Sequence, residues 1–391
     1  MDLYLGIDAG GTSTRALLTT STGERVGYGL AGGGNPVAHG VDAALAQITA
    51  AVKQALGEID PGRVANGVIG LAGLGALQDS AVHAAFTRAW AGCGLRFPVR
   101  GLEDPLLAFV AGTPQPSGHV LLSGTGAVAL RVEDRRVTHV ADGHGWLLGD
   151  EGSGFWLGRA AARHTIRHLT ATPAVRPEPG ISGGSSTHPP TTGTAGEQRT
   201  ETGRSPASAA ADPTGEHTVD GRSRGSAAGN ATGERTVDGR SDRPADAGHA
   251  GELVRLVAEA VAGPGAEPTA RIADLLIIRA QAAPVATLAP LAPLVGKAAQ
   301  AGDPAAVAIV ESAAERLLAT LAQVRAPGET SPIVLAGGVL TAEGPVREHV
   351  RRLCEKRWTT PVTIAGDTAA AAAWLAAGAQ GPHAAWLRAT P

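Results

Sequence analysis

The chain contains the same local pattern twice: a short apolar strand, a glycine turn and a returning strand. The first copy is expected at Leu3–Asp8 and Arg15–Thr20, with Ala-Gly-Gly-Thr-Ser in its turn. The second is expected at His119–Ser123 and Val128–Val132, on either side of Gly124-Thr-Gly. Apolar and β-branched runs bounded by glycines are typical of antiparallel hairpins. Two such openings in one chain predict two lobes with the same architecture.

Strands and helices alternate along the rest of the chain, which predicts the α/β class. Apolar residues recur at helical spacing, and short apolar runs that end in glycine are typical of buried strands. The expected helices are Val41–Leu56, Ser80–Ala91, Pro304 to about Val324, a segment from Pro345 and an alanine-rich closing segment capped by Asp367. The expected strands are Arg25–Gly29, a run from Gly67, Ile333–Ala336 and Val362–Ile364.

One long segment lacks these patterns. From 170 to 250 the chain is rich in Gly, Ser, Thr, Pro, Arg and Asp and has almost no large apolar side chain. It also contains near-duplicate sequences that start at Thr214 and Thr232. Such a composition cannot bury enough surface to offset an ordering entropy of ~1–2 kcal/mol per residue. We therefore expect a disordered insertion, with an arm that binds a partner as the alternative.

The insertion divides the chain into its expected domains. The first lobe is expected to cover 1–115, and the second to combine 116–169 with 251–391, with the insertion at 170–250. Whether the last helix packs back on the first lobe is left open. A chain of 391 residues is long enough for two lobes, because single cores usually stop growing below ~300 residues.

The composition excludes several classes of protein. A formal net charge of −3 gives no reason to expect a nucleic-acid partner, because such proteins need a basic face. Prolines interrupt the least polar stretch, around 280–296, and the chain does not start with a basic and then apolar leader, so we expect a cytoplasmic protein without a membrane partner. Cys93 and Cys354 are the only cysteines, which argues against a zinc site, an iron–sulfur cluster and a disulfide framework.

The two glycine turns could each bind a phosphate, although a plain hairpin turn is the alternative for either one alone. In the first, two glycines let backbone N–H groups approach an anion, and Thr12, Ser13 and Thr14 add hydroxyl donors. Asp8 would face a hydrated Mg²⁺ there. The second turn, Ser123–Gly126, offers the same chemistry. The sequence motifs of P-loop NTPases and Rossmann dehydrogenases are absent.

Two further acidic residues are candidates for sugar chemistry. Pro105 suits the first turn of a helix, so Asp104 is a candidate N-cap and also a candidate base for the proton of a sugar hydroxyl. Asp150 follows a glycine-rich stretch from Gly143, and we expect it to bind a pair of sugar hydroxyls. In the same loop we expect Trp146-Leu-Leu to pack inward, and a role for His144 is left open. Asn35, whose amide can donate and accept, is a sugar candidate or simply part of a turn.

Taken in order, these segments resemble the N-acetylglucosamine kinase / BadF-BadG-BcrA-BcrD ATPase family, which belongs to the actin/hexokinase/Hsp70 superfamily. The resemblance covers the chain outside the insertion, and Gly-Asp-Glu-Gly-Ser is its most specific part. It is carried by Asp8-Ala-Gly-Gly-Thr12, Gly34-Asn35, Gly70-Leu-Ala-Gly73, Asp104, Ser123–Gly126, Gly149-Asp-Glu-Gly-Ser153 and Ala336-Gly-Gly338. The resemblance implies two ribonuclease-H-like lobes of the actin-like ATPase/sugar kinase fold.

The resemblance also implies a role for each matching residue. ATP and Mg²⁺ would be the cofactors, with Asp8 serving the metal. The nucleotide would be held by Gly10, Gly11, Thr12, Ser123, Gly124, Thr125, Gly126, Gly337 and Gly338. The sugar would be held by Asn35, Gly73, Asp104, Gly145 and Asp150, with Asp104 also acting as the catalytic base.

The expected function is transfer of the γ-phosphate of ATP to the 6-hydroxyl of N-acetylglucosamine or a related amino sugar. Many kinases of the family carry a hydroxyl residue where this chain has Ala72, which leaves the preference for an N-acetyl group open. The alternatives are a glucosamine or N-acetylmuramic acid kinase, a BadF/BadG-type ATPase that activates a partner enzyme, and a sugar-sensing regulator. A homodimer is also left open.

Overall fold

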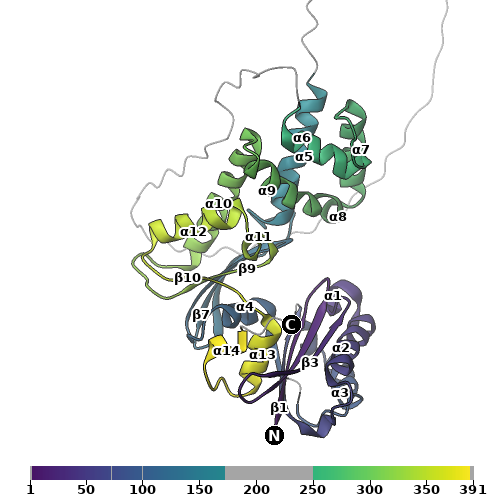
Figure 1. Ribbon diagram of the computed structural model, residues 1–391, viewed down its shortest axis with the longest axis vertical. Helices are drawn as coiled ribbons and strands as arrows, with labels where there is room; N and C mark the ends of the chain where they lie inside the picture. The colour runs from purple at the N-terminus through teal and green to yellow at the C-terminus, as the bar shows by residue number, and fades with distance from the viewer. Residues whose placement is uncertain (1, 72, 99, 172–249, 388–391) are drawn as a thin grey trace, which may run out of the picture. The chain divides into compact units, whose positions relative to one another are not determined.

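The computed structural model describes residues 2–71, 73–98, 100–171 and 250–387, which form two five-stranded mixed sheets and their helices (Figure 1). The predicted insertion lies outside these residues except at its two ends, and so does Ala72. Within the described ranges, no helix combines the length and the apolar character that crossing a membrane requires.

The first sheet places three strand ends at one edge. Its strands are β1 (Leu3–Ala9), β2 (Thr14–Thr20), β3 (Arg25–Ala31), β4 (Val64–Leu71) and β5 (Arg100–Glu103). The order is β3-β2-β1-β4-β5, in which β1, β2 and β3 form an antiparallel meander and β4 and β5 run parallel to β1. Because β1, β4 and β5 are parallel, Ala9, Leu71 and Glu103 end at the same edge.

The second sheet repeats this topology. Its strands are β6 (Gly118–Ser123), β7 (Ala127–Glu133), β8 (Arg136–Asp142), β9 (Ile333–Ala336) and β10 (Val362–Ile364). The order β8-β7-β6-β9-β10 has the same antiparallel meander and the same two parallel additions as the first sheet. The duplicated architecture confirms the predicted fold class, with each glycine turn joining the first two strands of its sheet.

Helices cover both faces of the first sheet. The elements that accompany it are α1 (Pro36–His39), α2 (Val41–Leu56), η1 (Pro61–Arg63), η2 (Leu74–Gln78), α3 (Ser80–Ala91) and α4 (Asp104–Gly112). Helix α2 packs closely against Gly27 and Gly29 of β3. The opposite face is covered by α13 (Thr368–Ala376), which comes from the far end of the chain.

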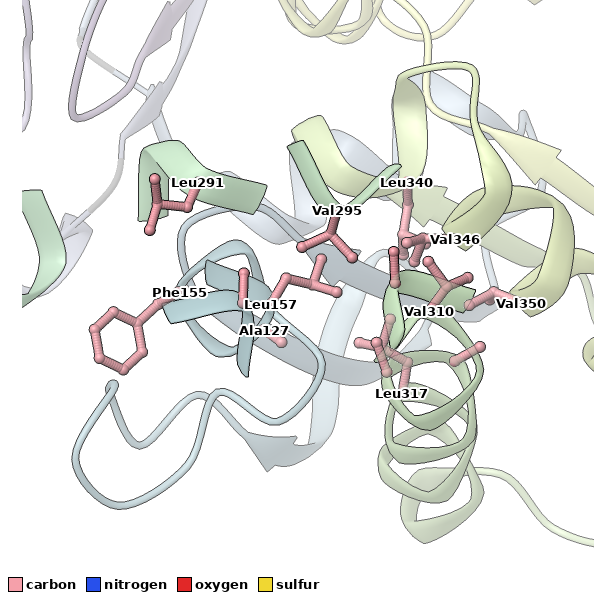
Figure 2. Close-up of a cluster of buried hydrophobic side chains, with 14 of the residues drawn as sticks. Ala127, Phe155, Leu157, Leu291, Val295, Val310, Leu317, Leu340, Val346 and Val350 are labelled. Carbon is pink, nitrogen blue, oxygen red and sulfur yellow. The ribbon is translucent and has the colours of Figure 1, made fainter. Parts of the chain in front are cut away.

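The second sheet packs against the largest core cluster (Figure 2). Its helices are α5 (Gly154–Thr170), α6 (Glu252–Ala262), α7 (Ala270–Ala282), α8 (Pro284–Leu288), η3 (Ala289–Leu291), α9 (Ala292–Gln300), α10 (Pro304–Val324), α11 (Gly338–Thr341) and α12 (Pro345–Arg357); α14 (His383–Leu387) ends the described chain. Val310 of α10 lies near Val346 and Val350 of α12 and near Leu340, and Leu317 belongs to the same cluster. The Asp303 side chain caps α10 by accepting from the backbone N–H groups of Ala305 and Ala306 at 2.9 and 3.0 Å.

Helix α13 lies in backbone contact with β1, and Gly6 is the reason. A Cβ atom at Gly6 would lie 1.9 Å from the carbonyl oxygen of Ala369 and 2.4 Å from the backbone nitrogen of Ala373. Any side chain at this position would therefore force the helix away from the strand. The sequence analysis left open whether the last helix reaches the first lobe, and the structure places α13 there.

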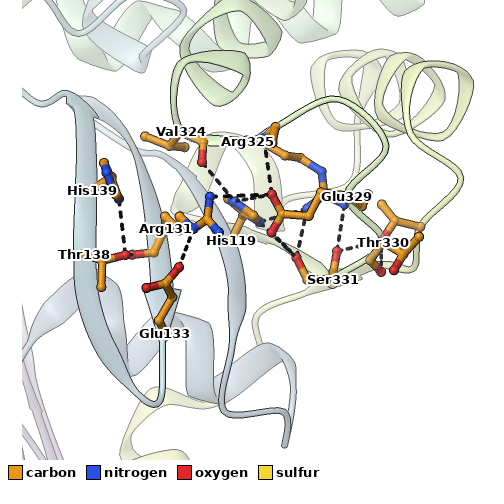
Figure 3. A network of polar contacts seen from close by, with 12 residues as sticks. His119, Arg131, Glu133, Thr138, His139, Val324, Arg325, Glu329, Thr330 and Ser331 are labelled. Carbon is orange, nitrogen blue, oxygen red and sulfur yellow. Dashed lines mark hydrogen bonds and ion pairs between the residues drawn. The ribbon is translucent and has the colours of Figure 1, made fainter.

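A buried polar network joins β6 to the loop between α10 and β9 (Figure 3). Arg325 Nη1 donates to Nδ1 of the fully buried His119 at 2.8 Å, so the proton of the neutral ring lies on Nε2 and is donated to the carbonyl of Val324 at 3.1 Å. Burial lowers the pKa of His119 to about 4, with Arg325 adding to the effect and Glu329 opposing it. Arg325 also donates to the carbonyls of Glu329 and Ser331, at 2.6 and 2.9 Å.

The seating of α13 can be tested with Gly6→Ala. We expect the added methyl group to lower the free energy of unfolding by about 1–3 kcal/mol, the usual cost of overpacking a close contact. Urea denaturation measures the change. Gly75→Ala is the matched control, because a Cβ at Gly75 would meet nothing within 4 Å. Equal stability of the two variants would contradict the backbone contact.

The His119 network predicts a specific pH dependence of stability. Between pH 6.5 and about 4 the unfolded chain binds a proton at His119 that the folded chain does not, so stability falls as the pH falls through this range. The loss should approach about 3 kcal/mol, at 1.36 kcal/mol per pKa unit. Urea denaturation at several pH values measures it. His119→Gln should remove this part of the slope, and an unchanged slope would show that His119 is not its source.

Candidate active site

The carboxyl edge of the first sheet brings together two acidic residues and one arginine. Asp8 pairs with Gly70 in the β1–β4 register, and Leu71 pairs with Glu103 of β5, which directly precedes Asp104. Burial raises the pKa of Asp104 to about 6, with the charge of Asp8 adding to the effect and Arg15 opposing it. The edge therefore holds a carboxyl group that titrates close to neutral pH.

The predicted capping role of Asp104 is wrong. The N-cap residue of α4 is Glu103, whose side chain makes no capping hydrogen bond, and Asp104 is the first residue of the helix. Pro105 follows in the first turn, as expected. Within the described part of the chain the Asp104 carboxyl group takes part in no hydrogen bond and no ion pair. Its oxygens are therefore not committed to holding the helix.

Asp8 is buried, and the structure gives its carboxylate two partners that the sequence analysis missed. Its Oδ2 atom forms an ion pair with Arg15 and accepts a hydrogen bond from the hydroxyl of Thr368 at 2.6 Å. Arg15 lies directly opposite Asp8 in the β1–β2 register, so the length of the turn could have identified it. Thr368 begins α13, and no local sequence signal links it to Asp8.

The first glycine turn is closed by its own backbone and open at its tip. The N–H of Gly10 donates to the carbonyl of Ser13 at 3.0 Å, and the N–H of Gly34 donates to the carbonyl of Gly10 at 2.9 Å. Gly11 and Thr12 are exposed, and a Cβ at Gly11 would meet nothing within 4 Å. This arrangement leaves room for an anion at the tip.

Asn35 and Gly73 lie together beside this turn. Asn35 caps α1, where its Oδ1 accepts from the N–H groups of Val37 and Ala38 at 2.8 and 3.3 Å. Gly73 has a φ of +82°, and a Cβ there would lie 3.2 Å from Asn35 Oδ1. Because the oxygen of Asn35 is engaged by the cap, its amide nitrogen is the atom left for a ligand.

The second glycine turn meets the start of α5 and the loop after β9. The N–H of Gly154 donates to the carbonyl of Gly124 at 2.7 Å, and that of Phe155 to the carbonyl of Thr125 at 3.2 Å. Gly337 has a φ of +80°, and a Cβ at that position would lie only 2.4 Å from the carbonyl oxygen of Ser123. Two predicted nucleotide segments, Ser123–Gly126 and Gly337-Gly338, are thus in contact.

A pocket of about 550 Å³ opens beside these glycines. It is lined by Gly124, Thr125 and Gly338, by further residues of α5, η3, α9 and α11, and by the start of α12 and the segment before it. This volume is in the range of small-molecule sites. Its walls are mostly apolar and carry the polar side chains Lys297, Gln300 and Glu343, none of which the sequence analysis identified.

Asp150 is tied to the second turn by its own side chain. Its Oδ1 accepts from the N–H of Ala127 at 3.0 Å, and a Cβ at Gly126 would lie 2.8 Å from the same oxygen. Asp142, which the sequence analysis missed, accepts from the N–H groups of Asp150 and Glu151 at 2.7 and 2.9 Å. Burial raises the pKa of Asp150. Asp142 ends β8 directly before the loop, which is the signal that could have found it.

The prediction that Trp146-Leu-Leu packs inward is wrong. Trp146, Leu147 and Leu148 are 38, 73 and 80% exposed. The side chain of Asp142 holds the backbone at the end of this glycine-rich loop. The Trp146 ring packs on Phe155, at 5.3 Å between centroids. Gly145 has a φ of +82° with open space around it, and the exposed His144 ring lies 3.9 Å from Asp142.

The structure thus gathers the predicted residues into two groups, one at each sheet. The first contains Asp8, Gly10, Gly11, Thr12, Asn35, Gly73 and Asp104. The second contains Ser123, Gly124, Thr125, Gly126, Gly145, Asp150, Gly337 and Gly338. Among the described residues, no hydrogen bond or ion pair joins the two groups.

Comparison with curated proteins finds two kinases of amino sugars that are similar to part of this chain. It is 30% identical over 179 residues to the glucosamine kinase GspK of Vibrio cholerae, covering 45% of this chain and 58% of that protein. It is 27% identical over 176 residues to the N-acetyl-D-glucosamine kinase of Dictyostelium discoideum, covering 42% and 54%. The chain thus spans a little over half the length of these curated relatives.

Solved structures agree on the fold. A protein from Chromobacterium violaceum that is proposed to be an N-acetylglucosamine kinase matches with a TM-score of 0.59 at 22% identity, over 96% of this chain and 99% of that one. A second such protein, from Porphyromonas gingivalis, matches with a TM-score of 0.59 at 15% identity, over 96% and 98%.

Residues 5–172 match the sequence model of the BadF/BadG/BcrA/BcrD ATPase family. Over these residues the chain is similar to that family, and the resemblance predicted from its sequence is confirmed for this part of the chain.

Proposed function

We propose that the protein is an ATP-dependent kinase that phosphorylates the 6-hydroxyl of N-acetylglucosamine or a related amino sugar. The observation that carries this proposal is the environment of the Asp104 carboxyl group. Its carboxyl group lies at the carboxyl edge of the sheet, has no hydrogen bond within the described chain and has a pKa of about 6. A base with these properties is mostly ionised at neutral pH and free to accept a proton.

Two glycine turns and the neighbouring pocket support the ATP-binding part of the proposal. The open tips at Gly11-Thr12 and at Thr125 suit phosphate groups, which backbone N–H groups and hydroxyls bind well. The pocket beside Gly338 has the size and the apolar walls that an adenosine needs. Gly337 and Gly338 would then border the adenosine, as the family resemblance implies.

The residues at the first turn also fit a magnesium ion. Asp8 uses Oδ2 for Arg15 and Thr368, while its Oδ1 accepts no hydrogen bond within the described residues. Mg²⁺ in phosphate sites is usually held by one or two carboxylates together with phosphate oxygens and water. Asp8 would hold the ion in this way, and the ion would neutralise charge on the phosphates.

The sugar would bind to residues from both groups. Asn35, Gly73 and Asp104 come from the first, and Gly145 and Asp150 from the second. The amide nitrogen of Asn35 is available as a donor, and the carboxylate of Asp150 retains an oxygen beyond the one that holds Ala127. The 6-hydroxyl would give its proton to Asp104 as its oxygen attacks the γ-phosphorus, and the bond from that phosphorus to the β,γ-bridging oxygen would break to release ADP. Positioning would supply most of the rate.

The alternative of a BadF/BadG-type activator is less well supported by this chain. That role, as the sequence analysis framed it, needs cysteine thiolates to hold a cluster. Cys93 and Cys354 are both buried, and burial raises the pKa of Cys354 to about 12. Such thiols stay protonated at neutral pH and are poor iron ligands. Glucosamine and N-acetylmuramic acid remain alternative acceptors.

The proposal is tested with Asp104→Asn. We expect this variant to bind ATP as the wild type does and to lose at least ~10²-fold in kcat, the usual contribution of a general base. A coupled assay with ATP, Mg²⁺ and a panel of amino sugars measures turnover. Glu103→Gln is the matched control, because Glu103 is exposed and its side chain makes no capping bond. A fully active Asp104→Asn variant would exclude Asp104 as the base.

A pH profile provides a second test of Asp104. A base works only when ionised, so kcat/KM should be constant above pH 7 and fall about tenfold per pH unit below the pKa of about 6. The decrease should be absent from the residual activity of Asp104→Asn. An activity that rises toward acid pH would mean that the reaction needs the protonated form, which contradicts the proposed mechanism.

A further inference from the structure

The carboxylate of Asp8 accepts a hydrogen bond from Thr368, the first residue of α13, which lies far from Asp8 in the sequence. Gly6 and Asp8 are two residues apart on β1, so both face the same side of the sheet. Gly6 lets the backbone of α13 reach the strand, and this brings the hydroxyl of Thr368 to 2.6 Å from Asp8 Oδ2. The close approach of α13 to β1 therefore fixes the position of the helix and also brings Thr368 into contact with Asp8.

Thr368 is held firmly at this position. Asp367 directly before it caps α13, with Oδ1 accepting from the N–H groups of Ala369 and Ala370 at 2.9 and 3.2 Å. The Oδ2 atom of Asp367 forms an ion pair with Arg25 of β3 at 2.7 Å. Asp367 thus both caps the helix and ties its start to the sheet, directly before Thr368.

Thr368 also lies between Asp8 and Arg15. Its hydroxyl donates to Asp8 Oδ2 and accepts from Nη2 of Arg15 at 3.1 Å, while the same Nη2 forms an ion pair with Asp8 Oδ2. Both donors therefore meet one oxygen of the carboxylate. The other, Oδ1, accepts no hydrogen bond within the described chain.

We propose that Thr368 is a positioning residue for Asp8, which keeps Oδ1 directed at the Mg²⁺–ATP of the proposed function. This inference rests on that function. Thr368 contacts Asp8 and its partner Arg15, and it lies outside the residues 5–172 that match the family.

The chemistry of arginine explains why a hydroxyl is needed here. A guanidinium and a carboxylate tend to pair through two parallel hydrogen bonds, which would engage both oxygens of Asp8. The Thr368 hydroxyl donates a hydrogen bond to Asp8 Oδ2 and accepts one from Nη2 of Arg15. The ion pair between Arg15 and Asp8 is therefore kept on Oδ2 alone. Without the hydroxyl, Asp8 can turn both oxygens toward Arg15, and Oδ1 is then less available as a ligand for a metal ion.

The experiment compares Thr368→Val, Thr368→Ala and Thr368→Ser in the full chain. The binding of ATP is followed by thermal shift and calorimetry, with Mg²⁺ titrated in and with Mg²⁺ removed by a chelator. We expect Val and Ala to weaken the apparent affinity for Mg²⁺ in the presence of ATP by about 10- to 100-fold, as loss of an outer-shell partner usually does. Binding of ATP without Mg²⁺ should not change, and Thr368→Ser should restore the wild-type Mg²⁺ dependence.

Thr363→Val is the matched control, because the buried hydroxyl of Thr363 has no hydrogen-bond partner in the described chain. It should behave as the wild type in every measurement. The Ala variant keeps the test valid if the Val variant does not fold, since alanine is well tolerated in a helix.

Wild-type Mg²⁺ dependence in both Thr368→Val and Thr368→Ala would overturn the inference. An equal loss of ATP binding with and without Mg²⁺ would also overturn it, because that result indicates a structural role. Failure of the proposed function is seen separately, as a wild-type protein that neither binds Mg²⁺–ATP nor phosphorylates an amino sugar.

Discussion

The backbone contact between α13 and β1 is the constraint on which the first group of site residues depends. Gly6 has no side chain, so Ala369 and Ala373 can rest directly on the strand. The helix then covers one face of the sheet while α2 covers the other, and Asp8 is buried under its first turn. A carboxylate buried in this way needs charged or hydroxyl partners, which Arg15 and Thr368 provide.

Duplication of the sheet gives the protein two similar turns with different surroundings. In the first lobe the turn lies next to two carboxylates and an arginine, and the charge of Asp8 helps to keep the pKa of Asp104 near neutral pH. In the second lobe the turn is closed by Gly337 and by the N-terminus of α5, beside a largely apolar pocket. The surroundings of the first turn are thus charged, and those of the second turn are largely apolar.

Several elements could be predicted because their signals are local. The hairpins show apolar runs around glycines, and α10 starts at a proline after the capping Asp303. The segment 252–300 was harder, because its prolines were interpreted only as interruptions. In the structure, Pro284, Pro290 and Pro293 each lie in the first turn of a short helix, where a proline is tolerated, and α9 forms a wall of the pocket. The prediction for Trp146 was wrong because it rested on the hydrophobicity of the side chains alone, whereas Trp146, Leu147 and Leu148 are exposed in that loop.

By itself, the sequence determined the α/β class, the two hairpin turns and the identity of the acidic residues at strand ends, since each depends on neighbours within a few positions. Only the tertiary structure decided that Thr368 contacts Asp8 and that Lys297 and Gln300 line the same pocket as Gly338. Those contacts join residues far apart in the chain, and their geometry is set by how closely two backbones can approach. The pattern of side chains along a single strand or helix does not indicate the distance between two packed backbones.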